Sequence, residues 1–133
     1  MADYEPLCMR RNPFTSTASG AITGGNVVEV AGSNLVQQSS VAGASAKAVG
    51  VAVADATAGG RVVFITRGNV HRTTGNGVIT AGDQLVSGTV AGTVRTLPAS
   101  GVPAPVDINN GRAVVGIALE TAADTQLVRW MEF

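Results

Sequence analysis

The chain has 133 residues, of which 45% are hydrophobic and 14% are charged, and its formal net charge at pH 7 is zero. This length corresponds to one ordinary domain, and the apolar fraction excludes an intrinsically disordered chain. A neutral chain lacks the basic field that holds nucleic acid, and the single cysteine, Cys8, excludes an intrachain disulfide and a thiolate zinc site. The low charge indicates either a surface covered by a partner or a domain that is simply rich in small residues.

The first 19 residues differ in composition from the rest of the chain. They contain Pro6 and Pro13, four charged side chains and no sustained hydrophobic periodicity. Proline keeps the backbone extended and excludes an amphipathic helix here. They also lack the apolar core of a secretory signal. The sequence therefore predicts an extended N-terminal arm over residues 1–19, which contributes little to folding and much to attachment, followed by a single β domain over residues 20–133.

From Gly20 onward, short runs rich in Val and Ile alternate with turns rich in Gly, Asn, Asp and Ser. Such runs are typical of half-buried strands, and many short strands at close spacing indicate a barrel or sandwich. The predicted fold class is therefore all-β, a small antiparallel β-barrel or sandwich-like domain. A helical signal over residues 39–48 is weakened by Ser and Gly, and residues 48–54, the longest apolar run, are too short to cross a membrane. Strands are expected at 26–30, 34–38, 47–54, 61–67, 69–73, 83–87, 93–97, 113–120 and 125–132.

The β domain repeats itself along the sequence. Residues 20–38 resemble residues 77–97, and "GVAVADATAGGRVVFI" at 50–65 resembles "GIALETAADTQLVRW" at 116–130. This pattern predicts two pseudo-repeated halves that close on one core, at about 20–76 and 77–133, with a proline-rich insertion at 98–112 in the second half.

Two glycines occupy matching places inside the strand patterns of the two halves, Gly50 and Gly116. A glycine within a strand marks a bulge, a sharp bend or a close approach of two backbones. The alternative is that these are tolerated small residues.

No residue pattern indicates catalysis, a cofactor or a metal site. His71 is the only histidine and lies near no cysteine or carboxylate cluster, so a surface or capping role is expected. Asp55 and Glu120 lie at near-equivalent turns of the two halves. Two facing carboxylates can hydrolyse a glycosidic bond, but the repeat explains them as turn residues. Phosphate-binding, dinucleotide and nucleophile-elbow motifs are absent from the sequence. We therefore expect a protein that is not an enzyme and binds no small-molecule substrate.

The aromatic residues are concentrated near the two ends of the chain. Tyr4 and Phe14 lie in the first 14 residues and Trp130 and Phe133 in the last four, whereas Phe64 lies in the middle of the chain, where an apolar strand should bury it. Tyrosine and tryptophan are enriched at interface hot spots, so the terminal aromatics are expected to contact another chain. The alternative is that the two termini pack on each other and cap the barrel.

Four segments in this order, "GAITGGNVVEV", "AVGVAVADATAGGRVVFITRGNV", "GVITAGDQLVSGTVAGTVRTL" and "GRAVVGIALETAADTQLVRWMEF", resemble the capsid cement (decoration) proteins of tailed bacteriophages. The resemblance covers about residues 20–133 and excludes the arm. It implies a small β-barrel-like domain that binds the outside of the capsid, often as a trimer at threefold or quasi-threefold positions. It also implies reinforcement of capsomer junctions and provides no catalytic residues.

The expected function is therefore that of a cement protein on the outer surface of the virion. Its expected partners are the major capsid protein and further copies of itself, with a trimer favoured, and neither nucleic acid nor a membrane is expected. Two alternatives stay open: another virion module such as a head fibre or tail component, and a carbohydrate- or peptide-binding β-module. The expected capsid or oligomer contacts are Tyr4, Leu7, Met9, Arg10, Arg11, Phe14, Trp130 and Phe133.

Overall fold

The computed structural model describes residues 13–98 and 111–133. All nine strands predicted from the sequence are present, and the all-β fold class is confirmed. Residues 39–48, which carried the weak helical signal, form no helix: turns precede the strand that begins at Ala48, with positive φ angles at Gly43 and Ala44. The strands are β1 (Pro13–Ala18), β2 (Val27–Gly32), β3 (Leu35–Gln38), β4 (Ala48–Ala52), β5 (Arg61–Ile65), β6 (Val70–Thr74), β7 (Gln84–Ser87), β8 (Val94–Thr96), β9 (Gly116–Ala118) and β10 (Leu127–Glu132).

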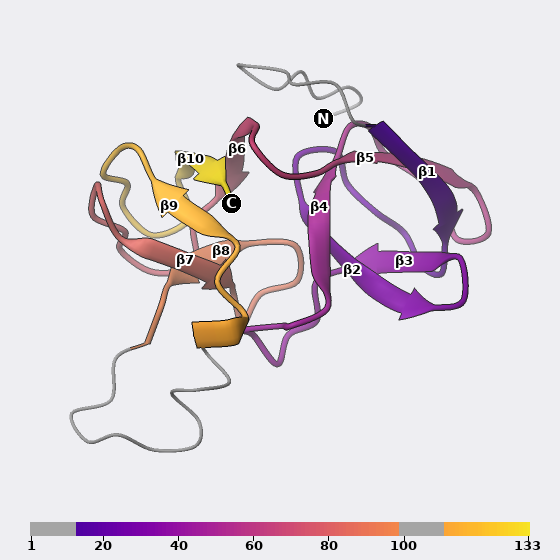
Figure 1. Ribbon diagram of the computed structural model, residues 1–133, viewed down its shortest axis with the longest axis horizontal. Coiled ribbons are helices and arrows are strands. Elements are labelled where there is room, and N and C mark those ends of the chain that lie inside the picture. Colours follow the sequence, from indigo (N-terminus) through magenta and orange to yellow (C-terminus); the bar gives the residue numbers. More distant parts are fainter. Residues whose placement is uncertain (1–12, 99–110) are drawn as a thin grey trace.

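The strands form two units of five that follow one another along the chain. Strands β1 to β5 make a closed barrel in the order β1-β3-β2-β4-β5, and strands β6 to β10 make a sheet in the order β6-β10-β9-β7-β8. Figure 1 shows the barrel on the right, in indigo and magenta, and the sheet on the left, in rose to yellow. The two orders coincide when β1 is matched with β6, β2 with β7, β3 with β8, β4 with β9 and β5 with β10.

The strand registers of the two units also coincide. Val28 on β2 lies opposite Gly50 on β4, and their counterparts Leu85 and Gly116 lie opposite each other. The parallel pairing of β1 with β3 that closes the barrel survives in the sheet as one isolated bridge, from Gly75 to Val94. The chain therefore contains two copies of one five-strand arrangement, and only the first copy is fully closed.

The boundaries predicted for the arm and for the halves are wrong by one strand. Strand β1 lies within the predicted arm at 1–19, yet it pairs with β5 from Pro13 to Thr17 and in parallel with β3. Likewise, β6 falls in the predicted first half at 20–76 but pairs with β10. The halves run over 13–65 and 70–132. The sequences of β1 and β6, "PFTSTA" and "VHRTT", share too few residues to reveal the repeat before Gly20 and Gly77.

Each half has its own hydrophobic core, and the two cores are built from matching positions. Phe64 of β5 is buried, as expected, and its counterpart in β10 is Trp130. The first core contains Ala18, Ile22, Val28, Val36, Ala52, Val62 and Phe64. The second contains Ile79, Leu85, Val94, Ala118, Ala122, Val128 and Trp130, joined by Val27 and Val51 of the first half. The barrel therefore packs against the sheet through these two valines.

Candidate interaction surfaces

The two halves meet where residues 25–27 of the first half lie against the open side of the second sheet, between β6 and β8. The Val27 amide donates to the Gly92 carbonyl oxygen at 2.9 Å, and the Thr73 hydroxyl donates to the Gly25 carbonyl oxygen at 3.0 Å. Gly92 has a φ of 77°, and a Cβ there would lie 2.7 Å or less from side-chain atoms of Asn26. We call this contact the internal seam. It requires glycine at position 92 because the φ angle is positive and the Asn26 side chain fills the space that a Cβ would take.

The corresponding place in the first half is an open groove lined by the first residues of β1 and the start of β3, beside the two residue pairs that join these strands. Ser16 and Asn34 are the counterparts of Thr73 and Gly92, and here the Ser16 hydroxyl donates directly to the Asn34 carbonyl oxygen at 2.7 Å. The groove leads into a cavity of about 530 Å³, and its apolar lining comes from Phe14, Val30, Leu35, Val49 and Phe64. We call it the β1–β3 groove. A cavity of this size and lining has the character of a binding site.

The predicted contact residues lie in different places. Phe14 is 54% exposed and stacks on Phe64 at the groove, with ring centroids 6.0 Å apart, and Phe133 is also exposed. Trp130 is only 1% exposed, so its assignment as a contact residue is wrong. Its indole N–H donates to the Thr73 hydroxyl at 3.0 Å, which satisfies the polar edge of the ring inside the core. Tyr4, Leu7, Met9, Arg10 and Arg11 lie outside the described residues.

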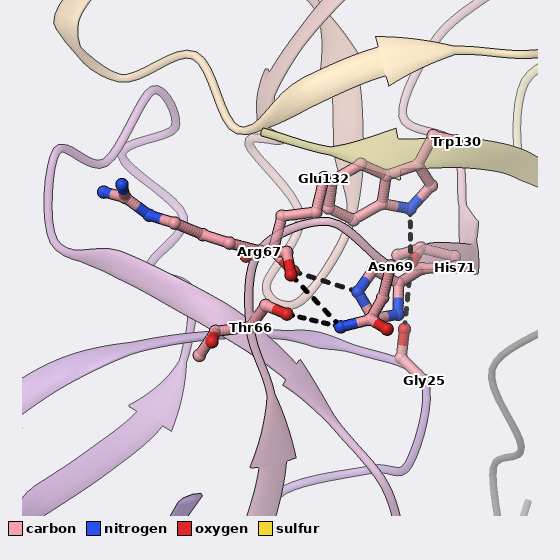
Figure 2. A network of polar contacts seen from close by, with 8 residues as sticks. Gly25, Thr66, Arg67, Asn69, His71, Trp130 and Glu132 are labelled. Carbon is pink, nitrogen blue, oxygen red and sulfur yellow. Dashed lines mark hydrogen bonds and ion pairs between the residues drawn. The ribbon is translucent and has the colours of Figure 1, made fainter. Parts of the chain in front are cut away.

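Sequence reasoning also missed a buried pair of titratable side chains, His71 and Glu132. The sequence predicts His71 at the surface, but it is fully buried, and its Nε2 lies 2.9 Å from Glu132 Oε2 (Figure 2). The pair lies 61 positions apart in the sequence and meets because β6 pairs with β10. The carbonyl oxygen of Glu132 accepts from Gly68, and its amide donates to the Asn69 carbonyl oxygen. These contacts hold residues 68 and 69, which connect the two halves, against the C-terminal strand β10.

Burial raises the pKa of the Glu132 carboxyl above its ordinary value of 4.5, because the hydrogen bond and charge of His71 offset the lost solvation only in part. A carboxyl with a raised pKa binds protons more tightly in the folded state. Its contribution to stability is therefore present below the unfolded pKa and is lost as pH rises through the folded pKa.

We expect Glu132→Gln to keep or raise the free energy of unfolding at pH 7, since it removes a buried charge and retains a hydrogen-bonding group. Urea unfolding at a series of pH values checks this. The stability of the wild type minus that of Glu132→Gln should fall as pH rises from about 4.5 toward neutrality. A difference that rises with pH would contradict the expectation. Glu120→Gln is the matched control, because the Glu120 carboxylate is less enclosed.

The other carboxylates singled out in the sequence hold backbone turns. Asp55 accepts from the Gly24 amide at 2.7 Å, and Glu120 accepts from the Arg129 amide at 2.9 Å. The structural counterpart of Asp55 is Thr121, which accepts from Ala81, so the match of Asp55 with Glu120 is off by one residue.

Within residues 13–98 and 111–133, no three His, Cys, Asp or Glu side chains gather as a possible metal site. In the same part of the chain, no helix has the length and apolar character to cross a membrane.

Comparison with known proteins finds several solved chains of similar architecture. No protein-family model matches the sequence, and no curated protein matches it. One of the matching structures is that of the head fiber gp8.5 N base in bacteriophage phi29, with 20% sequence identity and a TM-score of 0.58. The match covers 92% of this chain and 93% of the other. Because both chains are covered almost completely, the likeness extends to the fold of both halves together, and at this identity it shows the fold alone.

Proposed function

We propose that the chain is a structural protein of a phage head, which binds the outer capsid surface as a cement protein and stabilises contacts between capsomers without catalysing a reaction. The likeness to a head fiber base over 92% of the chain is the observation that carries this proposal. The sequence resemblance to cement proteins supports it independently. A fold can host unrelated functions, so the proposal depends on its surfaces as well as on its architecture.

The surface of the described part offers the apolar contact sites that such a role needs. Phe14, Val30, Val90 and Phe133 are large apolar side chains with more than two fifths of their area exposed. The expected partners are the major capsid protein and further copies of the chain, with a trimer favoured. Binding only to the assembled shell stabilises that shell by mass action, and self-association turns several weak contacts into strong attachment.

Co-sedimentation with empty heads tests the proposal. Heads assembled from the major capsid protein of the same phage are mixed with the purified chain and pelleted. We expect the chain to pellet with heads in a fixed, saturable ratio and to remain in the supernatant without them. A chain that stays in the supernatant at every ratio contradicts the proposal. Soluble, unassembled capsid protein is the control, since a cement protein binds the lattice rather than the subunit.

A head-fibre base is the second candidate, favoured by the same structural likeness. Both candidates predict binding to heads, but only a cement protein must strengthen the shell. The melting temperature of the heads with and without the bound chain separates them. A clear rise supports the cement assignment, and saturable binding with no rise supports the fibre base.

Two N-terminal deletions test which residues attach the chain and which fold it. Deleting residues 1–12 leaves every described strand intact, so the fold should melt within a few degrees of the wild type while binding to heads is lost. Deleting residues 1–18 removes β1, which pairs with both β5 and β3, so the barrel should open and unfold. Circular dichroism and co-sedimentation measure the two effects. Full binding after the shorter deletion would show that attachment depends on other residues.

A further inference from the structure

The internal seam joins two different surfaces. The first half contributes the entering surface, with Val27 and Val51, and the second half contributes the receiving surface, with Thr73 and Gly92. Because the chain is a repeat, each surface has a counterpart in the other half. On the entering side, Val27 and Val51 are 1% and 0% exposed because the second half covers them. Their counterparts in the second half are Gln84 and Ile117, which pair with each other just as Val27 pairs with Val51. Within the described part of the chain nothing comparable covers this second face: Gln84 is exposed and Ile117 is partly exposed.

The next strand of the same face shows the same difference. Ile65 on β5 lies beside Val51 and is 4% exposed, whereas its counterpart Met131 on β10 lies beside Ile117 and is 38% exposed. Gln84, Ile117 and Met131 therefore form a surface that repeats a buried one, and we call it the β7–β9–β10 face.

The receiving side is covered in the second half, whereas in the first half its apolar part is open to the groove cavity. In the second half, the carbonyl oxygen of Gly92 and the hydroxyl of Thr73 bond to residues 25–27 of the first half. In the first half, Ser16 and Asn34 occupy the same positions beside the β1–β3 groove. The Asn34 carbonyl oxygen accepts there from the Ser16 hydroxyl at 2.7 Å and from the Thr17 amide at 3.2 Å, so these polar groups bond within the barrel. Core residues that the seam covers in the second half, such as Trp130 and Val94, correspond to Phe64 and Val36, which line the groove cavity.

We propose that a second copy of this chain occupies the β1–β3 groove, with the β7–β9–β10 face of one molecule seated in the groove of the next. The contact between molecules would then repeat the apolar packing of the internal seam. Ile117 and Met131 would cover the apolar lining contributed by Val30 and Phe14, and Gln84 would lie beside Ser16 and Asn34. This inference deepens the self-association part of the proposed function and does not depend on capsid binding.

The geometry of such a contact determines the kind of assembly it can make. The two surfaces are different, so the interface is heterologous: each molecule offers one groove and one face. Head-to-tail contacts of this type close into a ring when the rotation between molecules permits, and the trimer favoured above would be such a ring. The same rule predicts that a molecule with one damaged surface can form one contact but cannot close a ring.

Sedimentation velocity on the full-length chain tests the proposal with two complementary variants. Ile117→Glu damages the face, and Val30→Glu damages the groove, while Val78→Glu, at another exposed valine, is the matched control. The wild type and Val78→Glu should sediment as a closed oligomer, and each of the two seam variants should be monomeric. An equimolar mixture of Ile117→Glu and Val30→Glu should form dimers and nothing larger, because one intact groove then meets one intact face.

Four results would overturn the proposal: a monomeric wild type, seam variants that keep the wild-type mass, a mixture that restores the full oligomer, and a chain that assembles only after residues 1–12 are deleted. The last would mean that the chain's own N-terminal segment occupies the groove. If either glutamate variant fails to fold, a cysteine pair replaces it. In a Cys8→Ser background, Val30→Cys and Ile117→Cys should cross-link between molecules, and an absence of cross-links counts against the proposal.

Binding to heads is measured separately, so the two ideas fail separately. A wild-type oligomer that does not bind heads contradicts the proposed function and leaves the seam contact intact. A monomer that binds heads contradicts the seam contact alone.

Discussion

Replacing Gly116 with alanine should cost the fold about 3 kcal/mol or more, and the same change at Gly50 should have a similar effect. A Cβ at Gly116 would overlap the carbonyl oxygen of Met131 and lie 2.7 Å from Cε3 of Trp130. A Cβ at Gly50 would overlap the carbonyl oxygen of Ile65 and lie 3.2 Å from Cδ2 of Phe64. Backbone cannot move aside as a flexible side chain can. Relief therefore requires loss of the pairing between β9 and β10, or between β4 and β5.

Urea unfolding of the two variants measures the effect, and Gly20→Ala provides the matched control. A Cβ at Gly20 would have no neighbouring atom within 4 Å, and the φ angle there is not positive. Alanine at this position should therefore change stability by no more than about 0.5 kcal/mol. If Gly50→Ala and Gly116→Ala were as mild as the control, both glycines would be merely tolerated small residues, and the close backbone approach would be refuted.

Trp130→Ala should destabilise the chain by about 3–5 kcal/mol, as large-to-small substitutions in well-packed cores do. The ring is fully buried among the second core residues, contacts His71 at a centroid distance of 5.3 Å and donates to Thr73. Removing it creates a cavity next to the internal seam. Thermal and urea unfolding measure the loss. Phe64→Ala should cost a comparable amount in the first half, because Phe64 holds the matching position.

Trp130→Phe separates packing from hydrogen bonding at the same position. The first half already uses phenylalanine here, so most of the packing should survive, and the lost bond to Thr73 should cost about 1–2 kcal/mol. A loss below about 1 kcal/mol for Trp130→Ala would instead identify a surface side chain, as the sequence had suggested, and would contradict the core assignment.

The strands of the β domain could be predicted because their signals are local. Runs such as "NVVEV" and "RVVFI" combine β-branched residues with flanking turn residues, and the turns themselves repeat. Gly50 and Gly116 could be identified for the same reason, since a glycine inside a strand pattern breaks a local rule at a site of close approach.

Features that depend on long-range pairing could not be predicted in this way. Strand β1 has few apolar residues, and its place in the fold follows from pairing with β5, some fifty positions later. The contact of His71 with Glu132 depends in the same way on the register of β6 against β10. Trp130 is a different case: the repeat aligns it with Phe64, and that alignment was a better guide to burial than its position near the end of the chain.

Cryo-electron microscopy of heads incubated with the purified chain tests the central claim, that this is a structural protein of the outer capsid surface, most directly. The account predicts added density on the outside of the shell at the junctions between capsomers. That density should fit the barrel and the sheet of each molecule, with head-to-tail contacts between neighbouring copies. Heads that carry no added density at saturating concentration, or density confined to the interior of the shell, would contradict the account.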